Sequence, residues 1–485
     1  MTIRVNMPHL SSRKTKIIAT LGPASDTQDV IYKLIEAGVN VFRLNMSHGE
    51  HDSHRRLYQL IRESATALNL HVAIFADLCG PKIRTGRFKD GSIILKKGDQ
   101  LVVTTRDVIG EDGLIPCQYR ALADDVTVGD RILLDDGKFE LRVRAKKGQD
   151  IDCEVIYGGE LKNNKGINLP GVNVSCPSLT EKDRADALFA LDLGVDYLAL
   201  SFVRKAEDIT DLRQLIVSNG YDTHIIAKIE KPEALTNGQD IIKAADAIMI
   251  ARGDLGVELN PEDVPIAQRQ LIKTARVLNK PVIVATQMLE SMIESSRPTR
   301  AEVADISNAV YSSTDAVMLS GETAAGYFPV EAVEIMSKVI KQTEAFMREQ
   351  DVFGKLAHRE NELKPLPFGD AVADATAQLC FDLHAKAIVS ITSGGGMSVV
   401  TLSSARPAAP LIAISANKWV CQRMNLYWGV VPMHSEEAGH AHPNKLARRY
   451  AIETELANVG DNVVVVRGFH QDSQLNSPTI TMLTL

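Results

Sequence analysis

Short apolar runs, each ended by polar residues and followed by a helix-like segment, recur along most of the chain. Their centres are rich in β-branched residues and lack polar alternation, which is typical of parallel strands buried on both faces. The predicted strands are Lys16 to Thr20, Val39 to Asn45, Val72 to Asp77, Asp196 to Arg204, His224 to Glu230, Asp246 to Asp254, Pro281 to Gln287 and Asp315 to Glu322. Such strands alternating with helices indicate an α/β fold, a TIM (β/α)8 barrel, with an open doubly wound sheet as the alternative.

Helix signals fill the stretches between the predicted strands. Thr180 followed by Asp183 matches a capping box, and Gly194 is placed to close the helix that they open. Pro329 is placed to open a long helix that ends near Gln350. These signals support the alternation of strands and helices.

A different pattern interrupts the predicted barrel after its third strand. From about Gly86 to Cys176, short alternating runs are separated by turns such as Asp136-Gly137, which is typical of a small β-rich, barrel-like domain. The loop after a barrel strand opens onto the catalytic face. We therefore expect this insertion to cover the active site as a lid.

A third unit is predicted after the polar, proline-containing stretch from Glu360 to Pro367. A helix, a strand from Ala387 to Thr392, a glycine-rich loop and further alternation indicate an α/β domain. The predicted boundaries are 1–85 and 177–355 for the barrel, 86–176 for the inserted lid, and 356–485 for a C-terminal domain of effector binding and oligomerisation.

Composition and charge narrow the class of function. The 485 residues are 45% hydrophobic and 24% charged, as in an ordinary globular protein. The net charge of −7 argues against nucleic acid or an anionic membrane as the main partner, but it leaves room for small anionic ligands. No apolar run approaches the ~20 residues of a membrane span. The six cysteines form no C-x-x-C motif, so we expect a protein of the reducing cytoplasm.

Polar residues stand where the predicted strands end, which is the functional end of a barrel. Lys228 and Glu230 are two apart on one strand, so their side chains point to the same face. Glu230 and Asp254 end neighbouring strands, and a pair of carboxylates with substrate oxygens suits Mg²⁺. A lone Lys–Glu pair reads as a simple ion pair, but burying the whole set without a ligand is costly. The other polar strand ends are Arg43, Asn45, Asp77, Ser201, Arg252, Thr286, Ser320 and Glu322.

Two glycine-containing loops offer backbone N–H groups to anions. The turn from Gly253 to Gly256 stands near the start of a following helical segment, which suits an anion site. The second loop follows a predicted strand of the C-terminal domain and suits one phosphate, with a plain tight turn as the alternative. Its candidate effector residues are Thr392, Ser393, Gly394, Gly395, Gly396 and Ser398.

Several of these segments resemble motifs of the pyruvate kinase family. Phe42 to Gly49 resembles its substrate loop, Ile226 to Glu230 its catalytic lysine motif, and Ile250 to Gly256 its metal motif. Ala285 to Met292 and Ser320 to Ala324 are similar to its motifs on strands seven and eight. The resemblance runs from about Lys14 to the end of the chain and includes the inserted domain. Several motifs in the same order are far more specific than any one of them.

The resemblance implies phosphoryl transfer from phosphoenolpyruvate to ADP, which gives pyruvate and ATP in the last step of glycolysis. It implies that Lys228 and Arg43 contact the transferring group, and that Glu230 and Asp254 bind Mg²⁺ or Mn²⁺. Phosphoryl transfer requires positive charge around the equatorial oxygens, which these groups would provide.

The remaining active-site roles also come from the resemblance. The N–H groups of Gly253 and Asp254, with the Thr286 hydroxyl, would hold the substrate carboxylate. Thr286 and Ser320 would organise water that protonates the enolpyruvate. The residues implied to contact the nucleotide are His48, Arg84, Lys165 and Asn45. The family also implies a homotetramer and a phosphorylated activator at the second loop, for which we expect a sugar monophosphate or AMP rather than fructose bisphosphate.

The third-strand motif departs from the common family pattern. Many pyruvate kinases need K⁺ and read Asp-Thr-Lys-Gly-Pro-Glu, whereas this chain reads Asp-Leu-Cys-Gly-Pro-Lys from Asp77 to Lys82. The residues matching the monovalent-cation site are Asn45, Ser47, Asp77 and Leu78, with Lys82 at the acidic position. The Lys82 ammonium would replace the ion, so we expect an enzyme of the potassium-independent branch. The alternative is that Lys82 points to solvent and the ion still binds.

Two other functions fit parts of the pattern. A Mg²⁺-dependent carbon–carbon lyase acting through an enolpyruvate would use similar carboxylates, but it would not need the lid or the nucleotide contacts. A non-catalytic sensor of phosphorylated metabolites would keep the C-terminal loop, but it would not need Lys228, Glu230 and Asp254. An assay with ADP and phosphoenolpyruvate separates the three.

Overall fold

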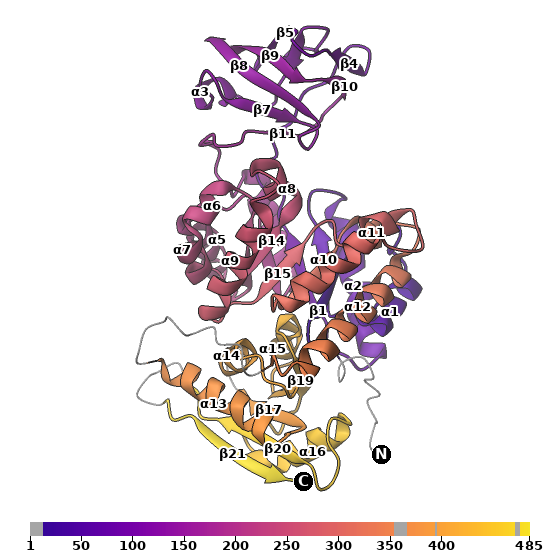
Figure 1. Ribbon diagram of the computed structural model, residues 1–485, viewed down its shortest axis with the longest axis vertical. Coiled ribbons are helices and arrows are strands. Elements are labelled where there is room, and N and C mark those ends of the chain that lie inside the picture. The colour runs from indigo at the N-terminus through magenta and orange to yellow at the C-terminus, as the bar shows by residue number, and fades with distance from the viewer. Residues whose placement is uncertain (1–12, 354–365, 393–394, 471–475) are drawn as a thin grey trace.

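The computed structural model describes residues 13–353, 366–392, 395–470 and 476–485. A central barrel carries a β-rich lid at one end and an α/β domain at the other (Figure 1). The barrel sheet closes in the order β1-β16-β15-β14-β13-β12-β3-β2, so the alternative of an open sheet is wrong. Closure brings the polar residues at the ends of all its strands to one rim.

The barrel strands start within two residues of their predicted positions, but several end earlier. Phe202, with a φ of 56°, follows the end of β12, and α8 begins directly after β14. The glycine turn predicted after that strand is therefore part of helix α8. The strands are β1 (Lys16–Thr20), β2 (Val41–Asn45), β3 (Ala73–Asp77), β12 (Tyr197–Leu200), β13 (His224–Ile229), β14 (Ala247–Ala251), β15 (Val282–Ala285) and β16 (Ala316–Leu319).

Helices surround the barrel, and the predicted helix signals are confirmed. Thr180 and Asp183 form a capping box, and Gly194 ends that helix in the left-handed conformation. Pro329 is the first residue of α12. The helices are α1 (Gln28–Ala37), α2 (His51–Ala67), α4 (Glu181–Leu193), α5 (Ala206–Ser218), α6 (Pro232–Thr236), α7 (Gly238–Ala244), α8 (Arg252–Glu258), α9 (Val264–Val277), η1 (Glu290–Ile293), α10 (Arg300–Tyr311), α11 (Gly321–Ala324) and α12 (Pro329–Glu349).

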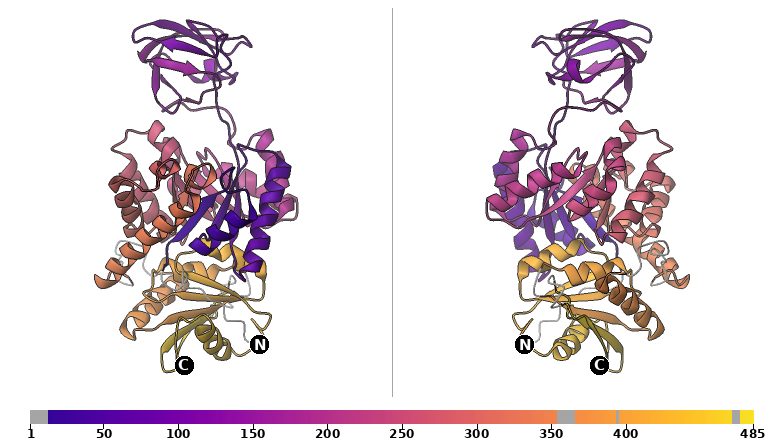
Figure 2. Two further views of the ribbon diagram at one scale, coloured as in Figure 1. Left: turned by 90° about the vertical axis from the view of Figure 1, so that its right-hand side faces the viewer. Right: turned by 90° about the vertical axis from the view of Figure 1, so that its left-hand side faces the viewer.

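The lid interrupts the barrel between β3 and β12, and two chain connections join it to the rim (Figure 2). It contains a sheet ordered β11-β7-β8-β9-β5-β6 and a ribbon of β10 and β4. Its elements are β4 (Ser92–Leu95), β5 (Gln100–Thr104), β6 (Leu114–Pro116), α3 (Leu122–Asp125), β7 (Arg131–Leu134), β8 (Phe139–Lys147), β9 (Asp150–Tyr157), β10 (Gly159–Lys162) and β11 (Ile167–Asn168). The insertion therefore stands over the end of the barrel where its strands finish.

The C-terminal domain packs under the other end of the barrel. Its sheet is ordered β19-β18-β17-β20-β21, with only the β20–β21 pair antiparallel. Its elements are α13 (Phe368–Asp382), β17 (Ala387–Ile391), α14 (Met397–Ser404), β18 (Leu411–Ser415), α15 (Lys418–Arg423), η2 (Met424–Leu426), β19 (Val430–His434), α16 (Pro443–Glu453), β20 (Asn462–Arg467) and β21 (Thr479–Thr484).

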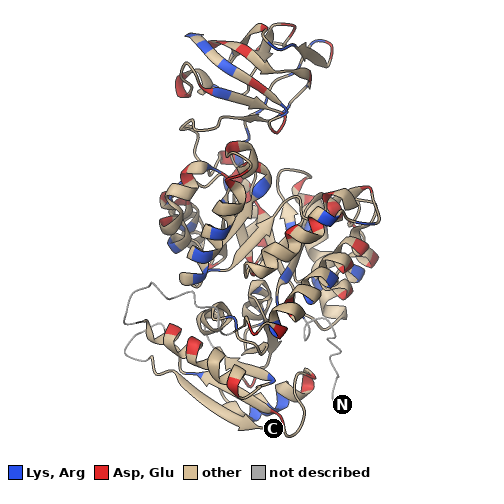
Figure 3. Ribbon diagram, in the orientation of Figure 1, with Lys and Arg blue, Asp and Glu red and all other residues tan. Residues whose placement is uncertain are grey.

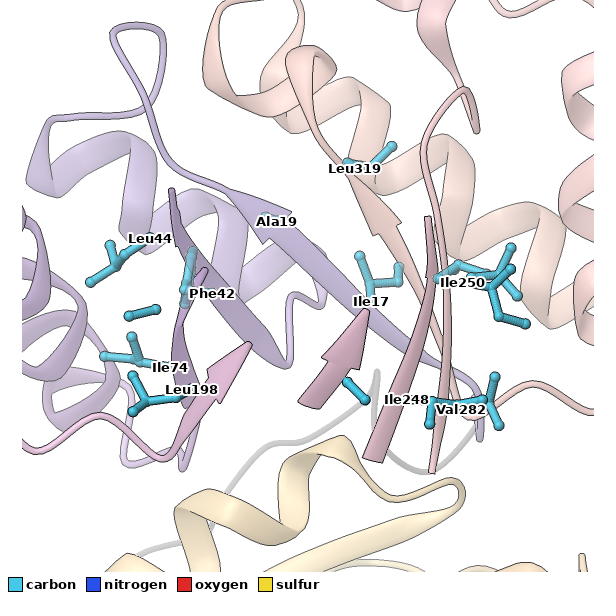
Figure 4. Close-up of a cluster of buried hydrophobic side chains, with 14 of the residues drawn as sticks. Ile17, Ala19, Phe42, Leu44, Ile74, Leu198, Ile248, Ile250, Val282 and Leu319 are labelled. Atoms are coloured by element: carbon cyan, nitrogen blue, oxygen red, sulfur yellow. The ribbon is translucent and has the colours of Figure 1, made fainter. Parts of the chain in front are cut away.

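Side chains of the barrel strands alternate between two buried layers. Ile17 and Phe42 belong to the layer between the strands and the helices (Figure 4). Their neighbours Ile18 and Val41 belong to a second layer inside the barrel. Charged residues are spread over the surrounding helices (Figure 3). Because both faces are buried, the strand sequences lack polar alternation.

The cysteines and the helix lengths agree with the sequence analysis. All six cysteine thiols are free. Within the described part of the chain, no helix has the length and apolarity needed to cross a membrane.

Candidate active site

The strands that close the barrel point a set of polar side chains into its upper end. Val41 and Phe75 fill the interior, and two residues further along the same strands stand Arg43 and Asp77. The same alternation directs Lys228 of β13 inward. The side chains that point inward therefore change from apolar to charged where the strands end.

Lys228 is at the centre of this set. Its ammonium lies 2.9 Å from Glu230 Oε1 and 3.2 Å from Asp77 Oδ1, and it donates a hydrogen bond of 2.7 Å to Ser201 Oγ. Arg43 lies on the other side of Asp77, with its Nη2 2.6 Å from Oδ2. The prediction that Lys228 and Glu230 share a face is confirmed.

The charges of this cluster shift one another's pKa. Burial alone would lower the pKa of Lys228, but Asp77 and Glu230 outweigh it and raise that pKa. Burial alone would raise the pKa of Asp77, but Lys228 and Arg43 outweigh it and hold that pKa below its usual range. Lys228 therefore stays a buried cation at neutral pH.

Glu230 and Asp254 form the candidate metal site. Burial, and then the negative charge of Glu230, raise the pKa of Asp254 to about 6. Glu230 Oε2 accepts a hydrogen bond of 2.7 Å from the Phe202 N–H, whereas Oε1 is buried without a hydrogen bond and is held only by the Lys228 charge. Among the described residues no group of three or more His, Cys, Asp or Glu is placed to hold a metal. Two carboxylates that repel each other fit Mg²⁺, which keeps several waters and substrate oxygens as ligands.

Thr286 stands beside the metal pair in an unusual backbone conformation. Its φ is 72°, and its hydroxyl accepts a hydrogen bond of 2.7 Å from the Gly253 N–H. Arg252 supports this conformation, because its guanidinium lies 2.7 Å from the Thr286 carbonyl and 2.7 Å from Asp305. The side chain of Arg252, which directly follows β14, therefore holds the backbone at Thr286 in place. Thr286 and Gly253, both expected to contact the substrate carboxylate, are adjacent and bonded to each other.

Two polar residues with different surroundings, Ser320 and Glu322, follow β16. The Ser320 hydroxyl is buried with no hydrogen-bond partner in the described ranges. Glu322 accepts hydrogen bonds from the N–H groups of Leu289, at 3.0 Å, and Ser320, at 2.7 Å. Glu322 is thus a structural residue, whereas the Ser320 hydroxyl has no hydrogen-bond partner among the described residues.

A cavity of about 330 Å³ opens between the rim and the lid, with residues of both in its wall. Arg84, Lys165 and Lys82 line it together with Asp254. His48 does not line it, but burial and then the positive charges of Lys82 and Arg84 lower the pKa of His48. Three of the four nucleotide candidates are therefore gathered at this cavity or near it.

Within the lid, Lys165 is held by a residue that sequence reasoning missed. Its ammonium lies 2.9 Å from Asp135. Asp135 and Asp136 form a turn in which both residues have positive φ, 50° and 56°. Asp136 also lines the cavity. The Asp136-Gly137 turn signal was visible in the sequence, but nothing in its spacing related it to Lys165.

A second missed group connects the lid to both metal-site segments. Glu258, the last residue of α8, lies 2.6 Å from the Lys231 ammonium and accepts a hydrogen bond of 3.3 Å from Asn168 of the lid. Lys231 follows Glu230, and Asp254 lies in the first turn of α8. The lid therefore contacts the two segments that carry the metal pair.

Most of the residues matched to a monovalent-cation site already have partners within the protein. The Leu78 carbonyl accepts a hydrogen bond of 2.7 Å from Ser201, and Asn45 Oδ1 accepts one of 3.2 Å from the Ser47 N–H. Both Asp77 oxygens contact cations, as described above. Lys82 is exposed at the cavity wall.

The second glycine loop lies in the C-terminal domain, far from the rim. Gly396, with a φ of 84°, precedes α14, and Ser398 Oγ lies 3.5 Å from Ser390 Oγ. Thr392 lines a separate cavity of about 740 Å³ with Lys418 and Arg467. Gly395 is exposed. The candidates Ser393 and Gly394 lie outside the described residues.

Comparison with known proteins gives a consistent result. Residues 12–333 match the family model of the pyruvate kinase barrel domain, and residues 370–481 match that of the pyruvate kinase alpha/beta domain. A pyruvate kinase of Geobacillus stearothermophilus is 45% identical over 463 residues, which cover 94% of this chain and 78% of the relative. One of Clostridium perfringens is 41% identical over 94% of this chain and 96% of its own. The crystal structure of a pyruvate kinase from Cryptosporidium parvum superposes with a TM-score of 0.91 at 37% identity, covering 98% of this chain and 97% of that one.

Proposed function

This chain belongs to the pyruvate kinase family and is a phosphotransferase, and from that premise we propose how its rim residues act in the reaction. Pyruvate kinases use phosphoenolpyruvate and ADP. The observation that carries the proposal is the buried Lys228 ammonium, held within 3.2 Å of two carboxylates beside Arg43.

Lys228 and Arg43 are proposed to contact the phosphoryl group as it leaves phosphoenolpyruvate. Negative charge spreads over the equatorial oxygens of this group in the transition state, so fixed cations lower the barrier. Lys228 is buried and stays charged, and a charge shielded from water interacts more strongly than an exposed one. Asp77 positions both cations, because its two oxygens contact one each.

Glu230 and Asp254 are proposed to hold Mg²⁺ or Mn²⁺. When bound there, the ion supplies Lewis-acid stabilisation of negative charge on the substrate oxygens. Burial, and then repulsion from Glu230, raise the pKa of Asp254, and this supports the assignment because a divalent cation relieves the repulsion.

Thr286, with the N–H groups of Gly253 and Asp254, is proposed to bind the substrate carboxylate. For this, the Gly253 N–H exchanges its hydrogen bond to the Thr286 hydroxyl for one to the substrate. Ser320 is proposed to orient water for protonation of the enolpyruvate carbon, since its buried hydroxyl has no other partner among the described residues.

The nucleotide is proposed to bind in the cavity below the lid, with Arg84 and Lys165 on its phosphates and His48 and Asn45 at the barrel side. Lys165 would leave Asp135 for the nucleotide when the lid closes. The contact of Asn168 with Glu258 would transmit that closure to the metal pair.

Lys82 is proposed to make the enzyme independent of K⁺. Lys82 lines the same cavity as Asp254. Burial and then Glu230 raise the pKa of Asp254, and the positive charge of Lys82 partly opposes that rise. Turnover in K⁺ salts should therefore equal turnover in tetramethylammonium salts within about twofold. A loss of tenfold or more without K⁺ would show that Lys82 does not replace the ion.

The regulatory part of the proposal concerns the C-terminal domain. A phosphorylated activator, a sugar monophosphate or AMP, would bind near Thr392, Gly396 and Ser398 beside the cavity that Arg467 lines. We also propose a homotetramer, which would cover exposed aromatic residues such as Tyr311 and Phe346 of α10 and α12. The free cysteines support a reducing cytoplasm as its location.

One assay tests the catalytic assignment. The full chain with Mg²⁺, ADP and phosphoenolpyruvate should form pyruvate and ATP in equal amounts, and Lys228→Met should abolish nearly all of this activity. Pyruvate formation without ATP would contradict phosphoryl transfer. The charged cluster, the inserted domain and the cavity between it and the rim support the kinase over the lyase and the sensor, neither of which needs all three.

A further inference from the structure

A second cavity lies at the opposite end of the barrel from the active site. Its volume is about 390 Å³, and it opens where the C-terminal domain meets the barrel. Thr66 and His71, from the end of α2 and the following loop, form the barrel wall. Lys418 and Gln422 of α15 and His434 of β19 form the opposite wall.

This interdomain cavity is lined by groups that carry or can carry positive charge. Arg62, His71, Lys418 and His434 line it, and neither Asp nor Glu is among its lining residues. The positive charge of Arg62 is neutralised by the buried carboxylate of Asp196, which lies 2.8 Å from its guanidinium. Lys418 is exposed and forms no ion pair within the described ranges. The cavity therefore holds positive charge that the described protein does not neutralise.

His71 responds to this excess of positive charge. Burial, and then the charges of His434, Lys418 and Arg62, lower the pKa of His71 to about 4. The ring is therefore neutral at pH 7 and offers one N–H donor. A half-buried histidine that shares a cavity with Lys418 and Arg62 provides surroundings that favour a bound anion.

The interdomain cavity shares two lining residues with the 740 Å³ cavity of the C-terminal domain. Lys418 and His434 line both the interdomain cavity and the 740 Å³ cavity. At the end of the same helix, Arg423 reaches the barrel and lies 2.8 Å from Asp222. An occupant that contacts Lys418 therefore touches the helix that joins the two domains.

We propose that the interdomain cavity binds a phosphate group, either as free inorganic phosphate or as part of a small phosphate ester. Lys418 supplies the charge, and His71 and Gln422 supply hydrogen-bond donors. The volume lies within the range of about 300–1,000 Å³ that is typical of small-molecule sites. This site is separate from the proposed catalytic site and from the glycine loop at Gly396.

Calorimetric titration of the full chain tests this proposal, with the active site occupied by Mg²⁺ and phosphoenolpyruvate. The probes are inorganic phosphate, ribose 5-phosphate and ribose. Thr66→Glu places a carboxylate at the rim, and Thr66→Gln is its uncharged control of the same size. Thr66 is exposed and its hydroxyl donates a hydrogen bond to the Arg62 carbonyl of the same helix, so neither variant disturbs the core. Lys418→Met removes the charge, and Arg467→Gln alters only the 740 Å³ cavity.

We expect Thr66→Glu and Lys418→Met to weaken the binding of phosphate at least tenfold, which corresponds to about 1.4 kcal/mol of binding free energy. Thr66→Gln should stay within twofold of the parent, and Arg467→Gln should leave the binding of inorganic phosphate within twofold, so that any loss of ribose 5-phosphate binding in Arg467→Gln reports the 740 Å³ cavity. Tighter binding of ribose 5-phosphate than of phosphate would identify an ester as the ligand, and equal binding would identify the free ion. Binding of ribose alone, no binding of either phosphate, or equal binding by Thr66→Glu and Thr66→Gln would overturn the proposal.

Discussion

Two buried lysines at opposite ends of the barrel show how the same side chain is put to different uses. Lys16 begins β1 at the lower end, and Lys228 stands near the end of β13 at the upper one. Burial, and then the charge of Arg13, lower the pKa of Lys16 to about 7. At Lys228 the carboxylates of Asp77 and Glu230 outweigh burial and raise the pKa. Burial is common to both, so nearby carboxylates make the difference.

The partners of the two lysines explain the contrast. Lys16 donates a hydrogen bond of 2.6 Å to the Val430 carbonyl of the C-terminal domain. Arg406 of that domain likewise lies 2.9 Å from Asp315 of the barrel. Lys16 and Arg406 therefore hold the two domains together. The charges at the upper end instead contact one another, because Asp77 lies between Arg43 and Lys228, and Lys228 also contacts Glu230.

The largest effect should come from removing one lysine at a time. Lys228→Met should lower kcat by about 10³ or more, which corresponds to about 4 kcal/mol of barrier. Lys16→Met removes the amine of another buried lysine, and its kcat should stay within threefold because no substrate group approaches it. Steady-state kinetics at saturating Mg²⁺ and substrates compare them. A loss below tenfold in Lys228→Met would remove Lys228 from the mechanism.

A second contrast separates two carboxylates at strand ends of the upper rim. Glu230→Gln should raise the Mg²⁺ concentration for half-maximal activity about 100-fold, because a charged ligand is lost. Glu322→Gln should leave it within twofold, since Glu322 accepts only backbone N–H groups. Titration of activity with Mg²⁺ measures both. Equal effects of the two substitutions would contradict the assignment of the metal pair.

A smaller effect is expected where the lid touches the barrel. Asn168→Ala removes the hydrogen bond to Glu258 and should raise the KM for ADP about fivefold. This corresponds to about 1 kcal/mol, the typical net contribution of one hydrogen bond. Its kcat should change less than twofold, because the chemistry lies elsewhere. Asn168→Asp should act more strongly, since it faces Glu258 with a like charge. An unchanged KM in both variants would mean that this contact plays no part in lid closure.

The smallest effect concerns the lower lysine and pH. The pKa of Lys16 is about 7 in the folded protein and about 10.4 in an unfolded chain. Between these values the unfolded chain binds more protons, so the free energy of unfolding rises with pH. The free energy of unfolding of the parent minus that of Lys16→Met, measured by denaturant unfolding, should therefore increase from pH 7 to pH 9, by up to about 1.4 kcal/mol per pH unit. A constant difference would show that Lys16 is charged when folded.

The fold was predictable because both faces of the strands are buried. Apolar runs such as that of β13 have no polar alternation, and only a closed or doubly covered sheet explains them. Strand ends were less predictable. The run after β14 continues into α8 without a break in the pattern, so the glycine turn was placed outside a helix that contains it.

The site was predictable where residues are close in sequence or end neighbouring strands. Lys228 lies in β13 and Glu230 directly follows that strand, so their contact follows from the spacing. The contacts of Arg252 with Thr286 and of Asn168 with Glu258 join distant segments, and their geometry exists only in the folded chain. The same holds for Lys165, whose partner Asp135 comes from another part of the lid.

A crystal structure of the full chain with Mg²⁺ and phosphoenolpyruvate, without ADP, tests the central claim most directly. The account predicts the phosphoryl oxygens at about 3 Å from Lys228 Nζ, the distance of a charge-assisted hydrogen bond. It also predicts the metal between Glu230 and Asp254. A phosphoryl group bound away from Lys228, with that lysine still paired only to Asp77 and Glu230, would contradict it.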